Sequence, residues 1–326
     1  MKRKIARLGT EVSALGMGCW AIGGPFHSGN QQVGWGNVDD AESERAIRTA
    51  LDLGVTFFDT ADVYGAGHSE RVVGRALGAD RSRVVIATKF ANLFDETTKS
   101  MMGSDASPDY VHRACEASLR RLETDYIDIL QLHDGGLAID AAAETREALE
   151  RLVTEGKIRG FGWSTDDTER AQSWASSDHC VAIQFQLNVL SDNAAMRGLC
   201  EQTGMAGINR GPLAMGLLSG KYENAGITDT EDVRGPNSPD WMRFFEQGKP
   251  SATFLSMMNS IREILTSEGR SLVQGALAWL WGRSERMLPI PGFKTVEQVT
   301  ENAKAMEFGP LSEQQIREID RILERD

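Results

Sequence analysis

Four polar side chains stand at the ends of apolar stretches that have the length and composition of buried β-strands. Asp59 ends the stretch 55–59 and Tyr64 follows it, Lys89 ends the stretch 84–89, and His133 follows the stretch 126–132. Taken singly, each has an ordinary explanation: a core tyrosine, a lysine where a strand reaches water, or a half-buried histidine. Together, on successive strands, they form a set that can do acid–base chemistry.

The chemistry of this set is general acid catalysis on a carbonyl group. A phenol with a pKa of about 10 is a weak acid at neutral pH, and we expect the neighbouring ammonium of Lys89 to lower that pKa. Asp59 can pair with Lys89, and His133 can donate a hydrogen bond to the carbonyl oxygen. Tyr64 would then protonate that oxygen as it gains charge. Because no side chain supplies hydride, reduction requires a cofactor.

The elements that must position these residues alternate along the chain. Apolar stretches that predict strands lie near Ala14 and at 55–59, 84–89, 126–132, 158–164, 181–186, 206–210 and 287–290. Amphipathic stretches that predict helices lie at 41–53, 68–77, 107–122, 143–155, 167–175, 192–202, 256–267, 272–281, 295–305 and 312–323. Such alternation is typical of α/β proteins with a parallel sheet.

Eight strand–helix units in a chain of 326 residues favour a closed (β/α)8 TIM barrel. We expect an N-terminal β-hairpin within 5–17 before it and extra C-terminal helices after it. Residues 1–326 are thus predicted to be a single barrel domain. A stretch rich in glycine, proline and aspartate at about 221–254 predicts a long loop over the mouth of the barrel.

The composition restricts the class of partner. The net charge is −12, which argues against nucleic-acid binding because that needs a basic surface. The cysteines are far apart, no apolar stretch approaches the length of a membrane span, and the histidines form no H-x-H pair. We therefore expect a cytoplasmic protein with free thiols, no metal site and no membrane partner.

The ordered motifs resemble those of the aldo-keto reductases over nearly the whole chain. They are GVTFFDTADVYG (54–65), VVIATK (84–89), DYIDILQLH (125–133), GKIRGFGWS (156–164), GPLAMGLLSGKY (211–222) and IPGFKTVEQVTEN (290–302). The resemblance implies the same barrel, an NADPH/NADP+ cofactor extended across its mouth, and reversible reduction of an aldehyde or ketone to an alcohol. It places the family's catalytic residues on Asp59, Tyr64, Lys89 and His133.

The resemblance also implies the cofactor contacts. Ser164, Thr165 and Gln184 correspond to residues that hold the nicotinamide amide, with Thr165 in place of the usual asparagine. Arg210 stands where the family often stacks an aromatic ring, although a guanidinium can also lie on a ring. The remaining contacts implied are Pro212, Leu213, Leu217, Ser219, Lys221, Gly292, Lys294, Gln298 and Asn302.

Lys294 is expected to pair with the 2′-phosphate and so to favour NADPH over NADH, because a phosphate needs a charge partner. The alternative is that Lys294 is a solvated lysine at the start of a helix and has no role in cofactor binding. Trp20, Phe26 and Trp35, in the loop after the first strand, are expected to line the pocket for a small-molecule carbonyl substrate, although core packing explains each nearly as well.

A non-catalytic reading is also open. Some barrels of this family are cofactor-bound regulatory or binding subunits, and the same NADPH site would serve that role. Because all four catalytic residue types are retained, the enzyme is the favoured interpretation.

Overall fold

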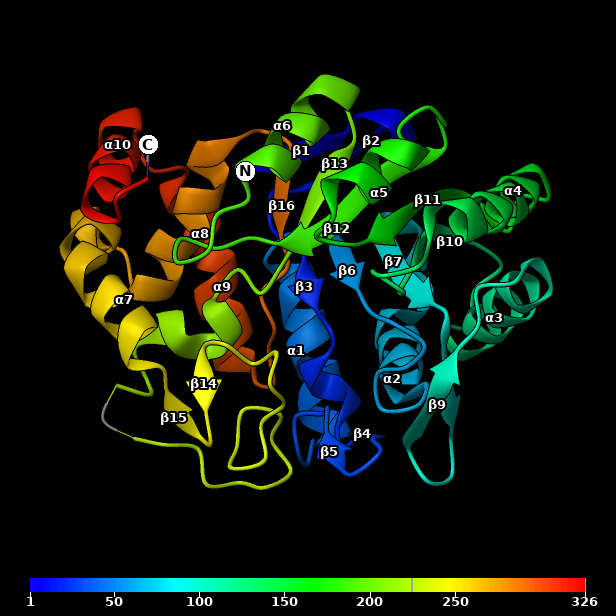
Figure 1. The fold of residues 1–326 in the computed structure, drawn as a ribbon, viewed down its shortest axis with the longest axis horizontal. Coiled ribbons are helices and arrows are strands. Elements are labelled where there is room, and N and C mark those ends of the chain that lie inside the picture. Colours follow the sequence, from blue (N-terminus) through cyan, green and yellow to red (C-terminus); the bar gives the residue numbers. More distant parts are fainter. Residues whose placement is uncertain (224, 326) are drawn as a thin grey trace.

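A computed structural model describes residues 1–223 and 225–325. Within this part, parallel strands form one sheet that curls around a central axis (Figure 1). Its strands are β3 (Met17–Gly18), β6 (Phe57–Asp59), β7 (Val85–Phe90), β10 (Ile127–Leu132), β11 (Ile158–Ser164), β12 (Cys180–Gln186), β13 (Ala206–Arg210) and β16 (Met287–Pro289).

The sheet closes on itself where its first strand meets its last. The amide of Gly16 donates to Pro289 O at 2.9 Å and that of Gly18 to Pro291 O at 3.0 Å. Gly18 must be glycine here, because a Cβ would lie 2.6 Å from Ile290 O. The predicted (β/α)8 barrel is confirmed.

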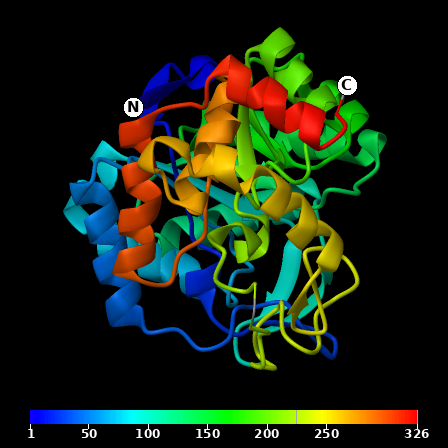
Figure 2. The same cartoon turned by 90° about the vertical axis from the view of Figure 1, so that its left-hand side faces the viewer.

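Helices surround the sheet. They are α1 (Asp40–Asp52), α2 (His68–Leu77), α3 (Pro108–Arg121), α4 (Ile139–Thr154), α5 (Thr168–Trp174), α6 (Ala194–Thr203), α7 (Ala252–Leu265), α8 (Leu272–Arg283), α9 (Val296–Phe308) and α10 (Glu313–Ile322). Figure 2 shows α1 and α9, far apart in sequence, side by side. Side-chain caps begin several helices, as where the Ser107 hydroxyl accepts from Tyr110 N, and each cap stabilises by about 1 kcal/mol.

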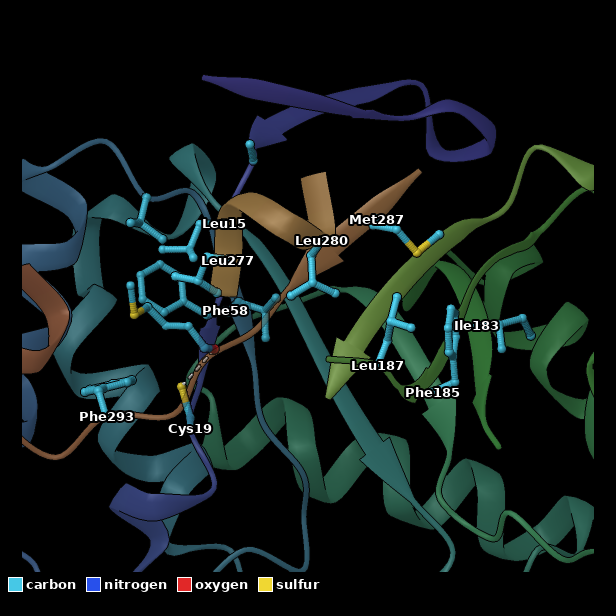
Figure 3. Close-up of a cluster of buried hydrophobic side chains, with 14 of the residues drawn as sticks. Leu15, Cys19, Phe58, Ile183, Phe185, Leu187, Leu277, Leu280, Met287 and Phe293 are labelled. Atoms are coloured by element: carbon cyan, nitrogen blue, oxygen red, sulfur yellow. Dashed lines mark hydrogen bonds between the residues drawn. The ribbon is translucent and has the colours of Figure 1, made fainter. Parts of the chain in front are cut away.

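Both faces of the sheet are covered by buried apolar side chains. Inward side chains such as Phe57, Ile129 and Ile208 form one cluster, while outward ones pack against the helices. Figure 3 shows part of the outer layer, where Phe58 lies near Leu277 of α8. Strands buried on both faces explain the continuous apolar stretches of the sequence.

The N-terminal hairpin covers one end of the barrel. It consists of β1 (Lys2–Ile5) and β2 (Thr10–Ser13), so it ends earlier than expected, and the first barrel strand begins at Met17 and not near Ala14. Ile5 and Val12 pack into the inner cluster. Arg7 donates to four backbone carbonyls, including Ser177 O at 2.7 Å, and ties the hairpin to α5 and α6. This end is therefore closed.

Loops gather at the opposite, carboxyl end of the strands (Figure 1). A small sheet that the sequence did not predict joins β4 (His27–Ser28), β5 (Gln31–Gln32), β8 (Asn92–Asp95) and β9 (Ser100–Ser104). The long segment before α7 carries a hairpin of β14 (Phe245–Glu246) and β15 (Lys249–Pro250). Its Val233 amide donates to Gly34 O at 2.8 Å, so it lies against the loop after β3.

Candidate active site

An ammonium, a carboxylate and a phenol meet at the carboxyl ends of β6 and β7. Lys89 Nζ donates to Asp59 Oδ1 at 2.5 Å, to Thr60 O at 2.8 Å and to Tyr64 Oη at 3.3 Å. These bonds occupy all three donors of the ammonium. Lys89 is fully buried, and a buried charge needs such partners. The phenol is thereby held beside the amine.

Two glutamines hold the other oxygen of Asp59. Gln184 Nε2 on β12 donates to Asp59 Oδ2 at 2.7 Å, and Gln131 Nε2 on β10 donates to it at 3.2 Å. Gln131 was not predicted, although a glutamine within an apolar strand, two residues before His133, was a signal of an inward polar group. Gln184 thus positions Asp59, and its amide nitrogen is already engaged there.

His133 presents its ring edge to Tyr64, with the ring centres 5.9 Å apart and the planes at 85°. Burial, followed by the charges of Lys89 and Arg210, lowers the pKa of His133 well below 6.5, so the imidazole is neutral at pH 7. Its Nδ1 is buried without a hydrogen-bond partner among the described groups. An unpaired ring nitrogen beside the phenol suits a polar atom of a ligand.

The acidity of Tyr64 differs from the expectation. Burial raises the pKa of Tyr64, the ammonium of Lys89 lowers it, and the charge of Asp59 raises it again, so that the net pKa lies above its ordinary value. Burial lowers the pKa of Lys89, but Asp59 and Tyr64 raise it, and the amine stays charged. The phenol is therefore not unusually acidic, because burial, together with the charge of Asp59, outweighs the effect of the ammonium. It keeps its proton at neutral pH.

A cavity of about 860 Å³ opens over Tyr64 and His133. Its apolar wall includes Trp20 and Phe26, two of the residues predicted to line the substrate pocket, and Trp241 of the long loop, which the sequence did not single out. Trp35 lies instead in a neighbouring groove, edge-on to Trp20 at 5.3 Å. The loop after β3 therefore forms the partition between the two spaces.

The neighbouring groove has a volume of about 520 Å³ and runs from Tyr64 towards α9. Most residues expected to bind the cofactor line it: Gln184, Arg210, Pro212, Leu213, Ser219, Lys221, Gly292, Lys294, Gln298 and Asn302. Leu217 is buried in the hydrophobic core. Ser164 and Thr165 line the larger cavity, and the Thr165 hydroxyl donates to Gly135 O at 2.9 Å and accepts from Asp167 N at 3.1 Å. Thr165 thus chiefly holds its own loop.

The groove carries cations in a chain with a net charge of −12. Lys221, Arg234 and Lys294 all line it. Arg234, which was not predicted, pairs with Asp232 at 2.8 Å. Local cations in an acidic protein suit a ligand with phosphate groups.

Two features of the groove were visible only in the structure. Lys294 Nζ donates to Trp35 O and to Asn37 O, so it holds the loop after β3 across the groove. Met215, which lines the groove, and the buried Ala214 before it have φ of 56° and 49°, a left-handed conformation that non-glycine residues rarely adopt. Such strain tends to collect at functional sites.

The two spaces meet at one place. The residues that line both are Trp20, Tyr64, Gln184, Arg210, Gly211 and Met215. A molecule in the groove and a molecule in the larger cavity would therefore touch beside the phenol. Within the described residues, acidic side chains, histidines and cysteines form no cluster suited to a metal ion.

Asp62 is a buried carboxyl group next to the site. It is 1% exposed, and its Oδ1 has no hydrogen-bond partner among the described groups. Burial, then the charge of Glu70, raises the pKa of Asp62 well above its ordinary value. Its contribution to stability is thus present in acid and is lost as the pH rises through the folded-state pKa.

We expect Asp62→Asn, which resembles the protonated acid, to raise the free energy of unfolding at pH 7 by about 1–3 kcal/mol. At pH 4, where this carboxyl group is also partly protonated in the unfolded chain, most of the gain should disappear. Urea unfolding at both pH values measures the difference. An equal gain at both, or a loss at pH 7, would contradict the assignment of a proton to Asp62.

Comparison with known proteins places this geometry in a family. The sequence profile described as "Aldo/keto reductase family" matches residues 14–324. A Glycine max protein named "Probable aldo-keto reductase 1" is 30% identical over 321 residues, covering 97% of this chain and 87% of that protein. A Schizosaccharomyces pombe protein named "Putative voltage-gated potassium channel subunit beta" is 31% identical over 334 residues, covering 98% of this chain and 92% of that one.

A solved structure supports the same family assignment. The crystal structure of an aldo-keto reductase from Klebsiella pneumoniae in complex with NADPH superposes with a TM-score of 0.70 at 29% identity, covering 99% of this chain and 96% of that one. In the described part of the chain, no helix combines the length and apolar character that crossing a bilayer requires. From the profile match and the shared fold, the chain belongs to the aldo/keto reductase family.

Proposed function

We propose that the protein reduces an aldehyde or ketone to an alcohol with NADPH, reversibly. The observation that carries this proposal is the 3.3 Å contact between Lys89 Nζ and Tyr64 Oη at the meeting point of the groove and the larger cavity. The family match and the NADPH complex of the Klebsiella pneumoniae structure support it.

The groove offers groups that fit NADPH. Ser219, Lys221 and Arg234 would face its pyrophosphate, and Lys294 its 2′-phosphate. When bound, NADPH supplies the hydride that reduces the carbonyl carbon. The remaining steps belong to side chains of the protein.

Those side chains polarise and protonate the carbonyl oxygen. The hydroxyl of Tyr64 and a ring N–H of His133 would donate to it, while Trp20 and its neighbours exclude water. As charge develops on the oxygen, the Tyr64 proton moves to it, because an alkoxide is far more basic than a phenolate, even one with a raised pKa. The phenolate left behind is stabilised by Lys89, which Asp59 keeps charged and in place.

Lys294 is expected to decide between NADPH and NADH. Burial lowers its pKa, but the ammonium lies in the groove on two carbonyl oxygens that a phosphate can replace as its partner. Lys294→Ala should weaken NADPH binding at least about tenfold and NADH binding much less, because only NADPH carries the extra phosphate. Calorimetric titration with each cofactor measures this. Equal losses would mean that Lys294 does not contact the phosphate.

A second candidate function is a cofactor-bound regulatory subunit. The observation that supports this second function is the similarity to the protein named a channel β subunit. The two functions differ in turnover. Rapid mixing of the NADPH complex with a reactive aldehyde should give fast loss of cofactor absorbance if the protein is an enzyme. Binding of NADPH without oxidation by any of a panel of carbonyls would favour the regulatory role.

A further inference from the structure

Arg210 lies where the two spaces meet. It ends β13, and its side chain lines both the groove and the larger cavity. Its guanidinium forms an ion pair with Asp166 and donates to Gln186 Oε1 at 3.4 Å. This arrangement places the charge of Arg210 where the reacting ends of a cofactor and a carbonyl would come together.

The carboxylate that pairs with Arg210 lies on the side of the larger cavity. Asp166 lines the larger cavity, and its Oδ1 accepts from the backbone amide of Gln186 at 2.7 Å, which holds it there. On the groove side, the neighbouring Gly211 and Pro212 are uncharged, and the carboxylate of Asp59, which also lines the groove, is paired with Lys89. The other cation at the junction, Lys89, is fully buried against Asp59. Arg210 is therefore the less completely neutralised of the two.

The charge of Arg210 acts across the junction. Burial, then Lys89, then Arg210 lowers the pKa of His133, and the charge of Arg210 also opposes the rise in the pKa of Tyr64. The same field must act on any charged ring placed beside Tyr64. The nicotinamide ring is neutral in NADPH and carries a positive charge in NADP+, so a fixed cation distinguishes the two forms.

We propose that Arg210 makes this protein bind NADPH more tightly than NADP+, by repelling the positive charge of the oxidised ring, and that Asp166 moderates the effect. The inference rests on the proposed function, since it needs NADP(H) in the groove. An aromatic ring at this position would do the opposite, because its face attracts a cation. Arg210 therefore biases the protein towards carbonyl reduction and rapid release of the oxidised cofactor.

The size of the effect follows from Coulomb's law. Two unit charges about 6 Å apart in a medium of effective dielectric constant about 20 change an equilibrium constant about a hundredfold. The Arg210 side chain is 39% exposed and paired with Asp166, and both facts weaken its field. We expect about a tenfold effect on the ratio of the dissociation constants of NADP+ and NADPH.

The test is that ratio, measured by calorimetric titration at low salt and pH 7, without any carbonyl substrate. Arg210→Met should lower the ratio about tenfold and Arg210→Lys should largely preserve it. Asp166→Asn, which removes the counter-charge but keeps an acceptor for Gln186, should raise it several-fold. Arg243→Met is the matched control: Arg243 is exposed, lies outside both sets of lining residues, and should leave the ratio unchanged.

Two results would overturn the inference while leaving the proposed function intact. One is that every variant binds both cofactors with the ratio of the parent. The other is that Arg210→Met and Asp166→Asn shift the ratio in the same direction, since opposite charges must have opposite effects. Failure of the parent itself to bind either cofactor would remove the proposed function, and this inference with it.

Discussion

Tyr64→Phe is expected to lower kcat for carbonyl reduction by about 10³–10⁴-fold. The change deletes the hydroxyl that would supply the proton in the proposed reaction and leaves the ring that forms part of the cavity wall. Lys89 keeps its bonds to Asp59 and Thr60, so the protein should fold normally. Because the phenyl ring keeps its place in the wall of the groove, the dissociation constant of NADPH should stay within about twofold of the parent value.

Steady-state kinetics with a panel of aldehydes and a cofactor titration measure the two quantities together. Tyr110→Phe is the matched control, since the Tyr110 hydroxyl donates to Asn92 O at 3.4 Å and lies outside both sets of lining residues. It should leave kcat nearly unchanged. A Tyr64→Phe variant as active as the parent would exclude Tyr64 as the proton donor.

The raised pKa of Tyr64 predicts how the rate of carbonyl reduction depends on pH. Between pH 7 and 9, burial keeps the phenol of Tyr64 protonated, and the lowered pKa of His133 keeps the imidazole neutral. The rate of reduction by the parent should thus stay level between pH 7 and 9. A fall in rate across this range would show that the phenol is more acidic than its surroundings indicate.

Lys89→Met is expected to damage both stability and activity. It leaves the carboxylate of Asp59, which is 2% exposed, without its countercharge, and breaking a buried ion pair costs about 3–5 kcal/mol. Turnover should fall at least as far as in Tyr64→Phe, because the phenolate loses its stabilising cation. Urea unfolding and steady-state kinetics measure the two effects.

A second change separates the charge from the packing. In the Lys89→Met background, Asp59→Asn removes the unpaired charge and should recover part of the lost stability without recovering activity. The surface variant Lys304→Met should alter the free energy of unfolding by less than about 0.5 kcal/mol. Full stability of Lys89→Met would mean that the buried pair does not exist in solution.

The elements that carry local signals could be predicted from the chain alone. The strands β11 and β13 and the helix α2 begin and end where the pattern of apolar residues places them. Ser107 and Asp39 begin α3 and α1 because a cap is a contact between residues two or three positions apart. The small sheet of β4, β5, β8 and β9 escaped prediction because its strands are short. Its two local hairpins, β4–β5 and β8–β9, join only through the pairing of β4 with β9, which are far apart in the sequence.

The sequence by itself determined that an acid, a phenol, an amine and an imidazole reach one rim, because successive parallel strands all end on the same side of a barrel. Only the tertiary structure decided how they act on one another. The bonds of Gln131 and Gln184 to Asp59, the place of Trp35, and the raised pKa of Tyr64 all depend on groups from distant strands and on the exclusion of water. Burial and electrostatic energy are properties of the assembled surroundings, so the spacing of residues along the chain does not specify them.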